Sequence, residues 1–143
     1  MKILEKVETE PLINKDQNFI QMPLGLLGFE QSKKYLLLAS PDEAPFLWLR
    51  MAEEPNISFL VISPFMVMPT YQPELSTEDV EFLRLKRPED AMIFNIVTLH
   101  GGQGATVNLK GPIVVNRQNL LGKQIIPVNA ANYSVQHAFP NLS

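Results

Sequence analysis

The sequence contains no cysteine, so it offers neither disulfides nor thiolate metal ligands. That absence fits a reducing compartment. No apolar run approaches the roughly 20 residues that a membrane helix needs, and the N-terminus lacks the apolar region of a signal peptide. We therefore expect a soluble cytoplasmic protein in which residues 1–143 form a single domain.

The sequence also lacks the patterns of catalytic and cofactor sites. It has no phosphate loop, dinucleotide fingerprint or calcium loop. His100 precedes two glycines, as in the oxyanion loop of some esterases, but the Gly-x-Ser-x-Gly elbow of those enzymes is missing. His100 and His137 lie far apart and make a poor zinc signal. We expect no enzyme, no metal site and no cofactor, and we interpret His100 as a loop residue.

Acidic residues are absent after Asp90, where Lys110, Arg117 and Lys123 are the charged residues that remain besides histidine. The front of the chain is therefore acidic, within a net charge of −3. This pattern is typical of a solvated surface, or of an acidic face that meets a basic partner. Direct nucleic-acid binding is disfavoured because phosphate contacts need clustered lysine and arginine.

Twelve prolines divide the chain into pieces of strand length, since proline fits neither a helix interior nor a central strand. Residues 57–62 are apolar on nearly both faces and predict a central strand, whereas the alternating residues 3–7 suit an edge strand. Many short strands with proline and glycine punctuation predict a mainly β fold, a small antiparallel barrel-like or sandwich domain.

Residues 95–116 form three β-rich runs, cut by the glycines at 101–104 and by Lys110-Gly111. Glycine permits the reversals, and the pattern predicts an antiparallel meander. Asparagine is depleted in strands, so we expect Asn95, Asn108 and Asn116 to form hydrogen bonds at turns and strand edges.

One short α-helix is predicted over about residues 76–86. Ser76 suits the N-cap, with its hydroxyl accepting from the Asp79 amide. Glu78 and Asp79 in the first turn favour the helix dipole, and Pro88 stops further winding. We expect Glu74, Glu78 and Glu81 to point outward, and the side chains of Glu78 and Asp79 to be exposed.

Residues 65–68 are an apolar run between two prolines, which predicts an extended segment. Two interpretations remain open. The run is a buried strand, or its methionines present an adaptable apolar surface for binding.

Six sequence blocks follow one another in an order that resembles the FliW family of flagellar assembly factors. The resemblance spans about residues 19–139 and rests on the ordered set rather than on a single motif. The blocks are residues 24–30 (LGLLGFE), 45–49 (PFLWL), 61–65 (VISPF), 71–75 (YQPEL), 105–116 (ATVNLKGPIVVN) and 122–124 (GKQ).

The resemblance implies a non-enzymatic regulator with a small barrel-like β fold. Members of the family bind flagellin in the cytoplasm before export. They also bind CsrA, an RNA-binding protein that represses flagellin translation, at a place away from its RNA-binding surface. The two partners exclude each other, so the factor freed by flagellin export captures CsrA and relieves repression.

We expect CsrA to meet the densest acidic cluster of the chain, because acidic residues steer a basic partner. We expect the amphipathic terminus of flagellin to need an apolar groove, and we expect the protein itself to be a monomer. The alternative function is a small β-barrel nucleic-acid-binding module. The candidate acidic residues are Glu74, Glu78, Asp79, Glu81, Glu89 and Asp90, and the candidate apolar residues are Phe65, Met66 and Met68.

Overall fold

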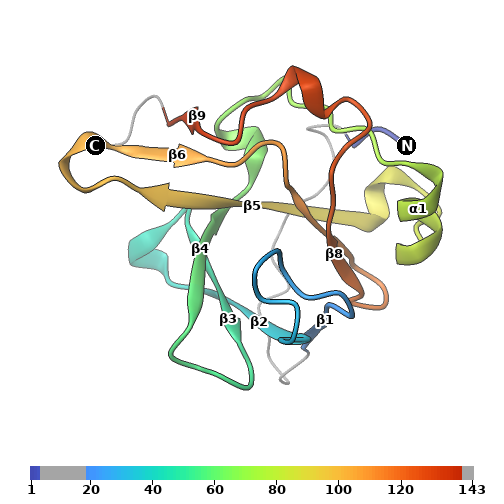
Figure 1. Cartoon of the computed structure of the whole chain (residues 1–143), viewed down its shortest axis with the longest axis horizontal. Helices are drawn as coiled ribbons and strands as arrows, with labels where there is room; N and C mark the ends of the chain where they lie inside the picture. The colour runs from blue at the N-terminus through green and yellow to red at the C-terminus, as the bar shows by residue number, and fades with distance from the viewer. Residues whose placement is uncertain (4–18, 140–143) are drawn as a thin grey trace.

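A computed structural model describes residues 1–3 and 19–139 (Figure 1). Within these residues one α-helix, α1 (Thr77–Leu83), accompanies nine short strands and five 3₁₀ turns. None of the helices in this part of the chain is long and apolar enough to cross a membrane. The strands are β1 (Ile20–Gln21), β2 (Lys34–Ala39), β3 (Leu47–Met51), β4 (Ser58–Ile62), β5 (Ala91–Leu99), β6 (Ala105–Val107), β7 (Ile113–Asn116), β8 (Gly122–Gln124) and β9 (His137–Ala138). The 3₁₀ turns are η1 (Pro41–Glu43), η2 (Pro64–Met66), η3 (Pro88–Asp90), η4 (Gly101–Gln103) and η5 (Ala130–Asn132).

The strands form one mainly antiparallel sheet in the order β1-β2-β3-β4-β5-β6-β9, with β7 pairing β5 and β8 pairing β7. β4 lies between β3 and β5, which confirms the central strand predicted over residues 57–62. The sheet curves but does not close by a continuous ladder. One parallel bridge, Gln21 to Leu121, links β1 to the residue before β8, and the Gln21 amide donates to the Leu120 carbonyl at 2.9 Å.

β5 is the longest strand and pairs with β4, β6 and β7. The meander prediction is correct for β5 and β6 but wrong for the third run. β7 pairs with the first half of β5, at Ala91 to Phe94, and the described ladders do not pair it with β6. The side chain of Asn108 explains the change of direction, because its Oδ1 accepts from the amides of Lys110 and Gly111 in a tight turn. The expected turn role of Asn108 is confirmed.

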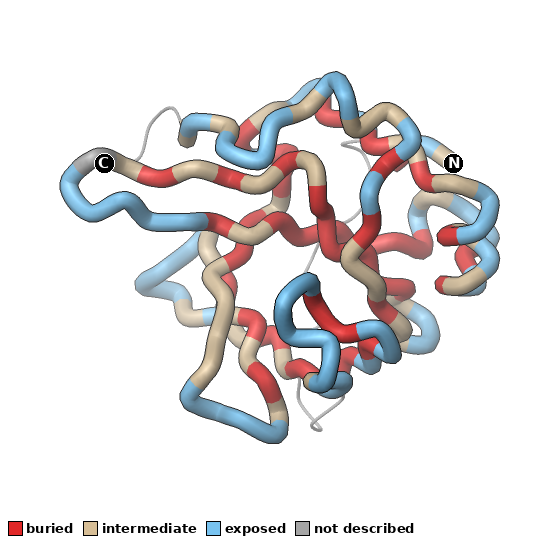
Figure 2. Tube along the Cα trace, viewed as in Figure 1, coloured by how far each residue is buried: buried red, intermediate tan, exposed pale blue. Residues whose placement is uncertain are grey.

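Two apolar clusters fill the two sides of the curved sheet. One is enclosed by β1 to β5 and β7 and includes Tyr35, Leu49 and Phe94. The other packs α1 and η2 against β5, β6 and β7, and includes Leu83. Figure 2 shows buried positions running along most of β5 between the two clusters. Apart from Asn95, the buried part of β5 is therefore apolar on both faces, as expected of a strand covered on both sides.

The helix begins where the sequence predicts and ends earlier. Ser76 is the N-cap, and its Oγ accepts from the Asp79 amide at 3.1 Å. α1 ends at Leu83, not near residue 86, because Arg84 takes a left-handed conformation with φ of 57°. Its amide donates to the Glu81 and Val80 carbonyls, which closes the helix.

The extended segment predicted over residues 65–68 is wrong. Pro64 opens the 3₁₀ turn η2, in which the Met66 amide donates to Ser63 and the Val67 amide donates to Pro64. Proline at the first position pre-sets the helical φ angle, which favours this turn. The turn buries Phe65 and exposes Met66.

Two smaller predictions have different outcomes. His100 lies in the loop after β5, as expected, with its Nε2 at 2.8 Å from Thr106 Oγ1. His137 lies in β9. Of the edge strand predicted over residues 3–7, only Ile3 lies among the described residues. It is buried, and its amide donates to the Pro73 carbonyl.

Candidate binding surfaces

The acidic residues of α1 differ in exposure. Glu78 and Glu81 are exposed, and Glu74, before the helix, is half-buried. Asp79 is only 7% exposed, so its expected exposure is wrong. Its Oδ1 lies 2.5 Å from Lys123 Nζ of β8, and that ammonium also lies 5.1 Å from the centroid of the Phe82 ring. Asp79 therefore joins the helix to the sheet.

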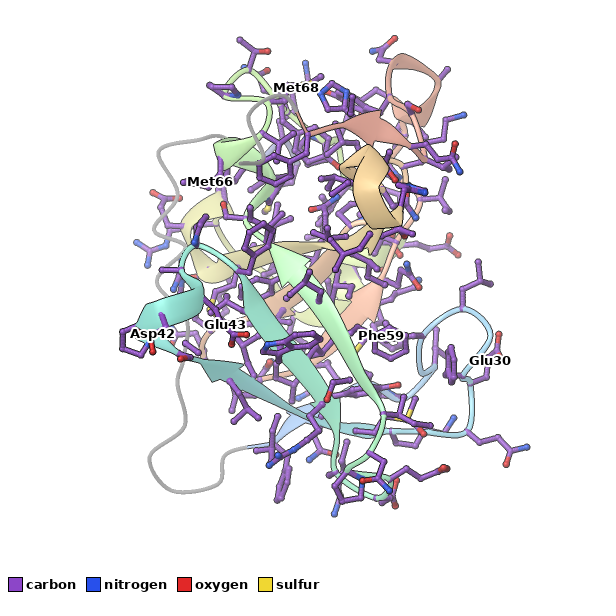
Figure 3. The ribbon with its side chains drawn as sticks, turned by 90° about the vertical axis from the view of Figure 1, so that its left-hand side faces the viewer. Glu30, Asp42, Glu43, Phe59, Met66 and Met68 are labelled. Atoms are coloured by element: carbon purple, nitrogen blue, oxygen red, sulfur yellow. The ribbon has the colours of Figure 1, made fainter. Side chains whose placement is uncertain are left out.

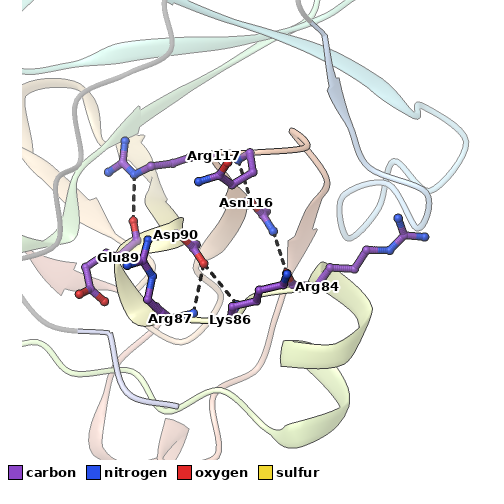
Figure 4. A network of polar contacts seen from close by, with 8 residues as sticks. Arg84, Lys86, Arg87, Glu89, Asp90, Asn116 and Arg117 are labelled. Carbon is purple, nitrogen blue, oxygen red and sulfur yellow. Dashed lines mark hydrogen bonds and ion pairs between the residues drawn. The ribbon is translucent and has the colours of Figure 1, made fainter.

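Asp90 at the end of η3 is also buried and is part of a polar network (Figure 4). Its Oδ2 accepts from the amides of Arg87 at 3.1 Å and Lys86 at 3.3 Å. Burial alone would raise the pKa of the Asp90 carboxyl, but these two amides and the Arg87 guanidinium outweigh it and lower the pKa. Asp90 thus fixes the turn after α1, whereas Glu89 is exposed.

Three cations lie in the hollow that Asp90 lines. Arg84, Lys86 and Arg87 are exposed and line a polar hollow of about 530 Å³. Asp90 and three amide side chains complete its lining. The surface around α1 therefore carries negative charge near the start of the helix and positive charge after its end. Of the six acidic candidates, the structure leaves Glu78, Glu81 and Glu89 exposed.

The three apolar candidates also differ in exposure. Phe65 is buried, with its ring centroid 6.1 Å from that of Tyr71, and Met68 is half-buried against the same cluster. Met66 is 60% exposed and lines a separate hollow with Phe46 and Phe94. Met68 follows η2 and lies apart from Met66 in Figure 3. Of the three, Met66 is the one whose side chain is well exposed.

Sequence reasoning missed the largest group of exposed aliphatic side chains. Leu24, Leu27, Ile126 and Val135 are all more than half exposed and line one hollow of about 420 Å³, which we name the aliphatic hollow. They are four of the eight large apolar residues exposed in the described part of the chain. Large contiguous apolar patches are rare on soluble proteins and mark interaction sites.

Local structure holds the aliphatic hollow in shape. The loop before β2 turns at Gly25, with φ of 67°, where an added Cβ would lie 2.6 Å from the Phe29 carbonyl oxygen. The Leu27 amide donates to Gln124 Oε1 at 3.0 Å, which ties the loop to β8. The Gln124 Nε2 in turn donates to the Gly111 carbonyl. The glycines that flank Leu26 and Leu27 were the signal available in the sequence.

Comparison with known proteins identifies the family. The family model described as FliW protein matches residues 3–139. The chain belongs to the FliW family. The flagellar assembly factor FliW of Natranaerobius thermophilus is 37% identical over 143 residues, which cover 99% of this chain and 93% of that protein. The flagellar assembly factor FliW of Magnetococcus marinus is 41% identical over 113 residues, which cover 78% and 70% of the two chains.

A solved structure supports the same conclusion. The crystal structure of a flagellar assembly factor FliW superposes with a TM-score of 0.81 and 31% identity, covering 100% of both chains. The family resemblance and the fold class, a mainly antiparallel β structure with one helix, are confirmed. The relatives are described as flagellar assembly factors.

Proposed function

We propose that this protein is a non-enzymatic partner switch of the cytoplasm. As a monomer it binds flagellin before export. When flagellin is exported, the freed protein binds the translational repressor CsrA instead and relieves repression of flagellin translation. Membership of the FliW family supports a role with flagellar proteins. The choice of flagellin and CsrA rests on the resemblance described above.

The aliphatic hollow is the observation that carries the flagellin half of the proposal. An amphipathic helix binds by laying its apolar face into an apolar groove. Leu27 is 82% exposed and Ile126 is 69% exposed at the hollow, so a docked helix would remove much apolar surface from water. Glu30 and Lys110 are the only charged residues of its lining and have opposite signs. The hollow therefore suits an apolar stripe better than a charged one.

The exposed carboxylates Glu78, Glu81 and Glu89 support the CsrA half of the proposal. Charged residues at the rim of an interface steer association more than they add affinity. Glu74, half-buried before the helix, lies at the edge of this surface. In this proposal Asp79 and Asp90 support the acidic surface indirectly, because their ion pairs hold α1 and η3 in place. Of the three apolar candidates Met66 is exposed, and Phe65 and Met68 lie in or against the core.

The nucleic-acid alternative has little support from these surfaces. Single-stranded nucleic acid needs a basic groove with aromatic side chains for stacking. The polar hollow that contains Arg84, Lys86 and Arg87 has no aromatic lining. Trp48 lines another hollow, whose charged lining residues are the acidic Asp42 and Glu43.

Calorimetric titration with purified monomeric flagellin and with purified CsrA tests the proposal. We expect each partner to bind with a Kd of about 1 μM or tighter, equivalent to about −8 kcal/mol. We also expect preformed flagellin complex to release flagellin when CsrA is added in excess. If neither partner binds at micromolar concentration, the proposed function is wrong. A stable ternary complex in size-exclusion chromatography would contradict the exchange between partners.

A further inference from the structure

η1 and the residues after it form a second apolar surface, on the side of the molecule opposite α1 (Figure 1). Two hollows of about 400 and about 340 Å³ lie next to each other and share Ala44 and Phe46. The first also contains Met66, and the second contains Trp48 and Leu99. We name this region the η1 surface and define it by Asp42, Glu43, Phe46, Trp48, Met66 and Leu99.

The apolar side chains of the η1 surface are both accessible and held in place. Met66 and Leu99 are each 60% exposed. The Phe46 ring packs against Phe139 with centroids 5.6 Å apart. The indole N–H of Trp48 donates to Glu43 Oε1 at 3.1 Å. Rings fixed in this way lose little freedom when a partner binds, which favours affinity.

The charge of the η1 surface has one sign. Asp42 and Glu43 are exposed and are the only charged residues that line the two hollows. Within residues 1–3 and 19–139, the recorded ion pairs join Arg87 to Asp90 and Lys123 to Asp79, so no cation neutralises this pair at close range. The surface around α1 differs, because Arg84, Lys86 and Arg87 line a hollow there together with Asp90.

We propose that the η1 surface docks a basic amphipathic helix of a partner protein. The apolar stripe of the helix enters the two hollows, and its lysine or arginine side chains contact Asp42 and Glu43. A second copy of this chain fits less well, because a two-fold interface places the same patch against itself. Asp42 and Glu43 of one copy would then face the same two carboxylates of the other, and like charges repel. The same carboxylates repel an acidic helix.

The η1 surface is distinct from the flagellin site proposed above. Figure 3 shows Asp42, Glu43 and Met66 along one side of the molecule and Glu30, which lines the aliphatic hollow, on the other. The two regions share no lining residue. Binding at the η1 surface is therefore separable from binding at the aliphatic hollow.

Trp48 provides a direct readout, since it is the only tryptophan of the chain. The experiment titrates the full-length ¹⁵N-labelled protein with a helical peptide of about 18 residues, or five turns, that has leucine on one face and lysine on the other. A matched peptide carries glutamate in place of lysine. We expect the lysine peptide to shift the Trp48 indole resonance and to bind at least about tenfold more tightly than the glutamate peptide.

Charge reversal supplies the matched test. The double variant Asp42→Lys, Glu43→Lys is expected to bind the lysine peptide about tenfold more weakly. Glu53→Lys with Glu54→Lys makes the same charge change in the exposed turn between β3 and β4 and is expected to leave the affinity within about twofold. Met66→Ser removes apolar contact and is expected to weaken binding severalfold without altering charge.

Three results would overturn the proposal. The first is that the Trp48 resonance does not move at saturating lysine peptide, and the second is that the two peptides bind equally tightly. The third is that the resonance shifts with protein concentration alone, which would assign the surface to a second copy. The peptide titration does not depend on flagellin or CsrA. We expect Asp42→Lys, Glu43→Lys to bind both proteins as the wild type does. Loss of binding to flagellin or to CsrA in this variant would overturn the claim that the η1 surface is separate from the sites proposed above.

Discussion

Lys123 in β8 and Asp79 in α1 are 44 positions apart in sequence, yet the lysine Nζ lies 2.5 Å from the carboxylate Oδ1. Both side chains are largely buried, with 24% and 10% of their surface exposed. Asp79 also supplies the amide that Ser76 caps. This pair attaches the only α-helix of the described residues to the sheet and so fixes how Glu78 and Glu81 are presented.

Replacing Asp79 with asparagine should destabilise the fold. The substitution keeps the size of the side chain but removes the charge that pairs with Lys123. We expect the free energy of unfolding to fall by about 1.5–3 kcal/mol, the range for hydrogen bonds to charged groups. Urea denaturation measures it as a shift in the midpoint at constant m value. Glu78→Gln, an exposed neighbour, should change stability by about 0.5 kcal/mol or less. Equal effects of the two variants would contradict the role of the pair.

The Asp90 carboxyl should stabilise the fold in a pH-dependent way. Its pKa is lowered in the folded protein, so its contribution is complete above the unfolded pKa of about 3.9 and disappears as the pH falls through the folded pKa. We expect the wild type to be more stable than Asp90→Asn at neutral pH, with the difference shrinking below about pH 4. Denaturation curves at a series of pH values measure this. A difference that grows on acidification would refute the assignment.

Charge reversal at Glu78 and Glu81 should slow association with CsrA. Both side chains are exposed, and neither is part of an ion pair recorded in the described structure. Stopped-flow measurements should show an on-rate lower by about tenfold at low ionic strength, where the Debye length is about 30 Å at 0.01 M. The effect should nearly vanish at about 1 M salt. Glu53→Lys with Glu54→Lys, a matched charge change elsewhere, should have less effect. An unchanged on-rate would show that α1 is not the docking face.

The fold was largely predictable from the sequence where local signals decide it. The apolar pattern of residues 57–62 predicts a central strand, and Ser76 marks the start of the helix. The end of the helix depends on a distant residue. Asn116 Nδ2 donates to the Leu83 carbonyl at 2.8 Å and to the Arg84 carbonyl at 3.2 Å, and thereby completes the C-terminus of α1 from β7. The sequence of residues 76–88 alone could not predict that contact, because the donor lies in β7.

The binding surfaces were less predictable, for the same physical reason. Glu78 and Asp79 are adjacent acids in one helical turn, and side chains at neighbouring positions point in different directions. Glu78 faces solvent and Asp79 faces Lys123, a partner that local sequence does not reveal. The aliphatic hollow is built from separate chain segments that meet only in the folded protein. These are residues 24–30, 108–111, 124–126 and 130–135.

The central claim is that the aliphatic hollow binds flagellin. The most direct test is the Kd of the double variant Leu27→Asp, Ile126→Asp for purified monomeric flagellin. Both side chains are well exposed, so the variant should fold as the wild type does, which its urea midpoint checks. Leu99→Asp, an exposed apolar residue outside the hollow, is the matched control.

We predict that calorimetry will show flagellin affinity at least about tenfold weaker for the double variant. The two apolar side chains that flagellin would bury on binding are charged in this variant. Leu99→Asp should bind within about twofold of the wild type. Unchanged flagellin affinity in a correctly folded Leu27→Asp, Ile126→Asp variant would contradict the account.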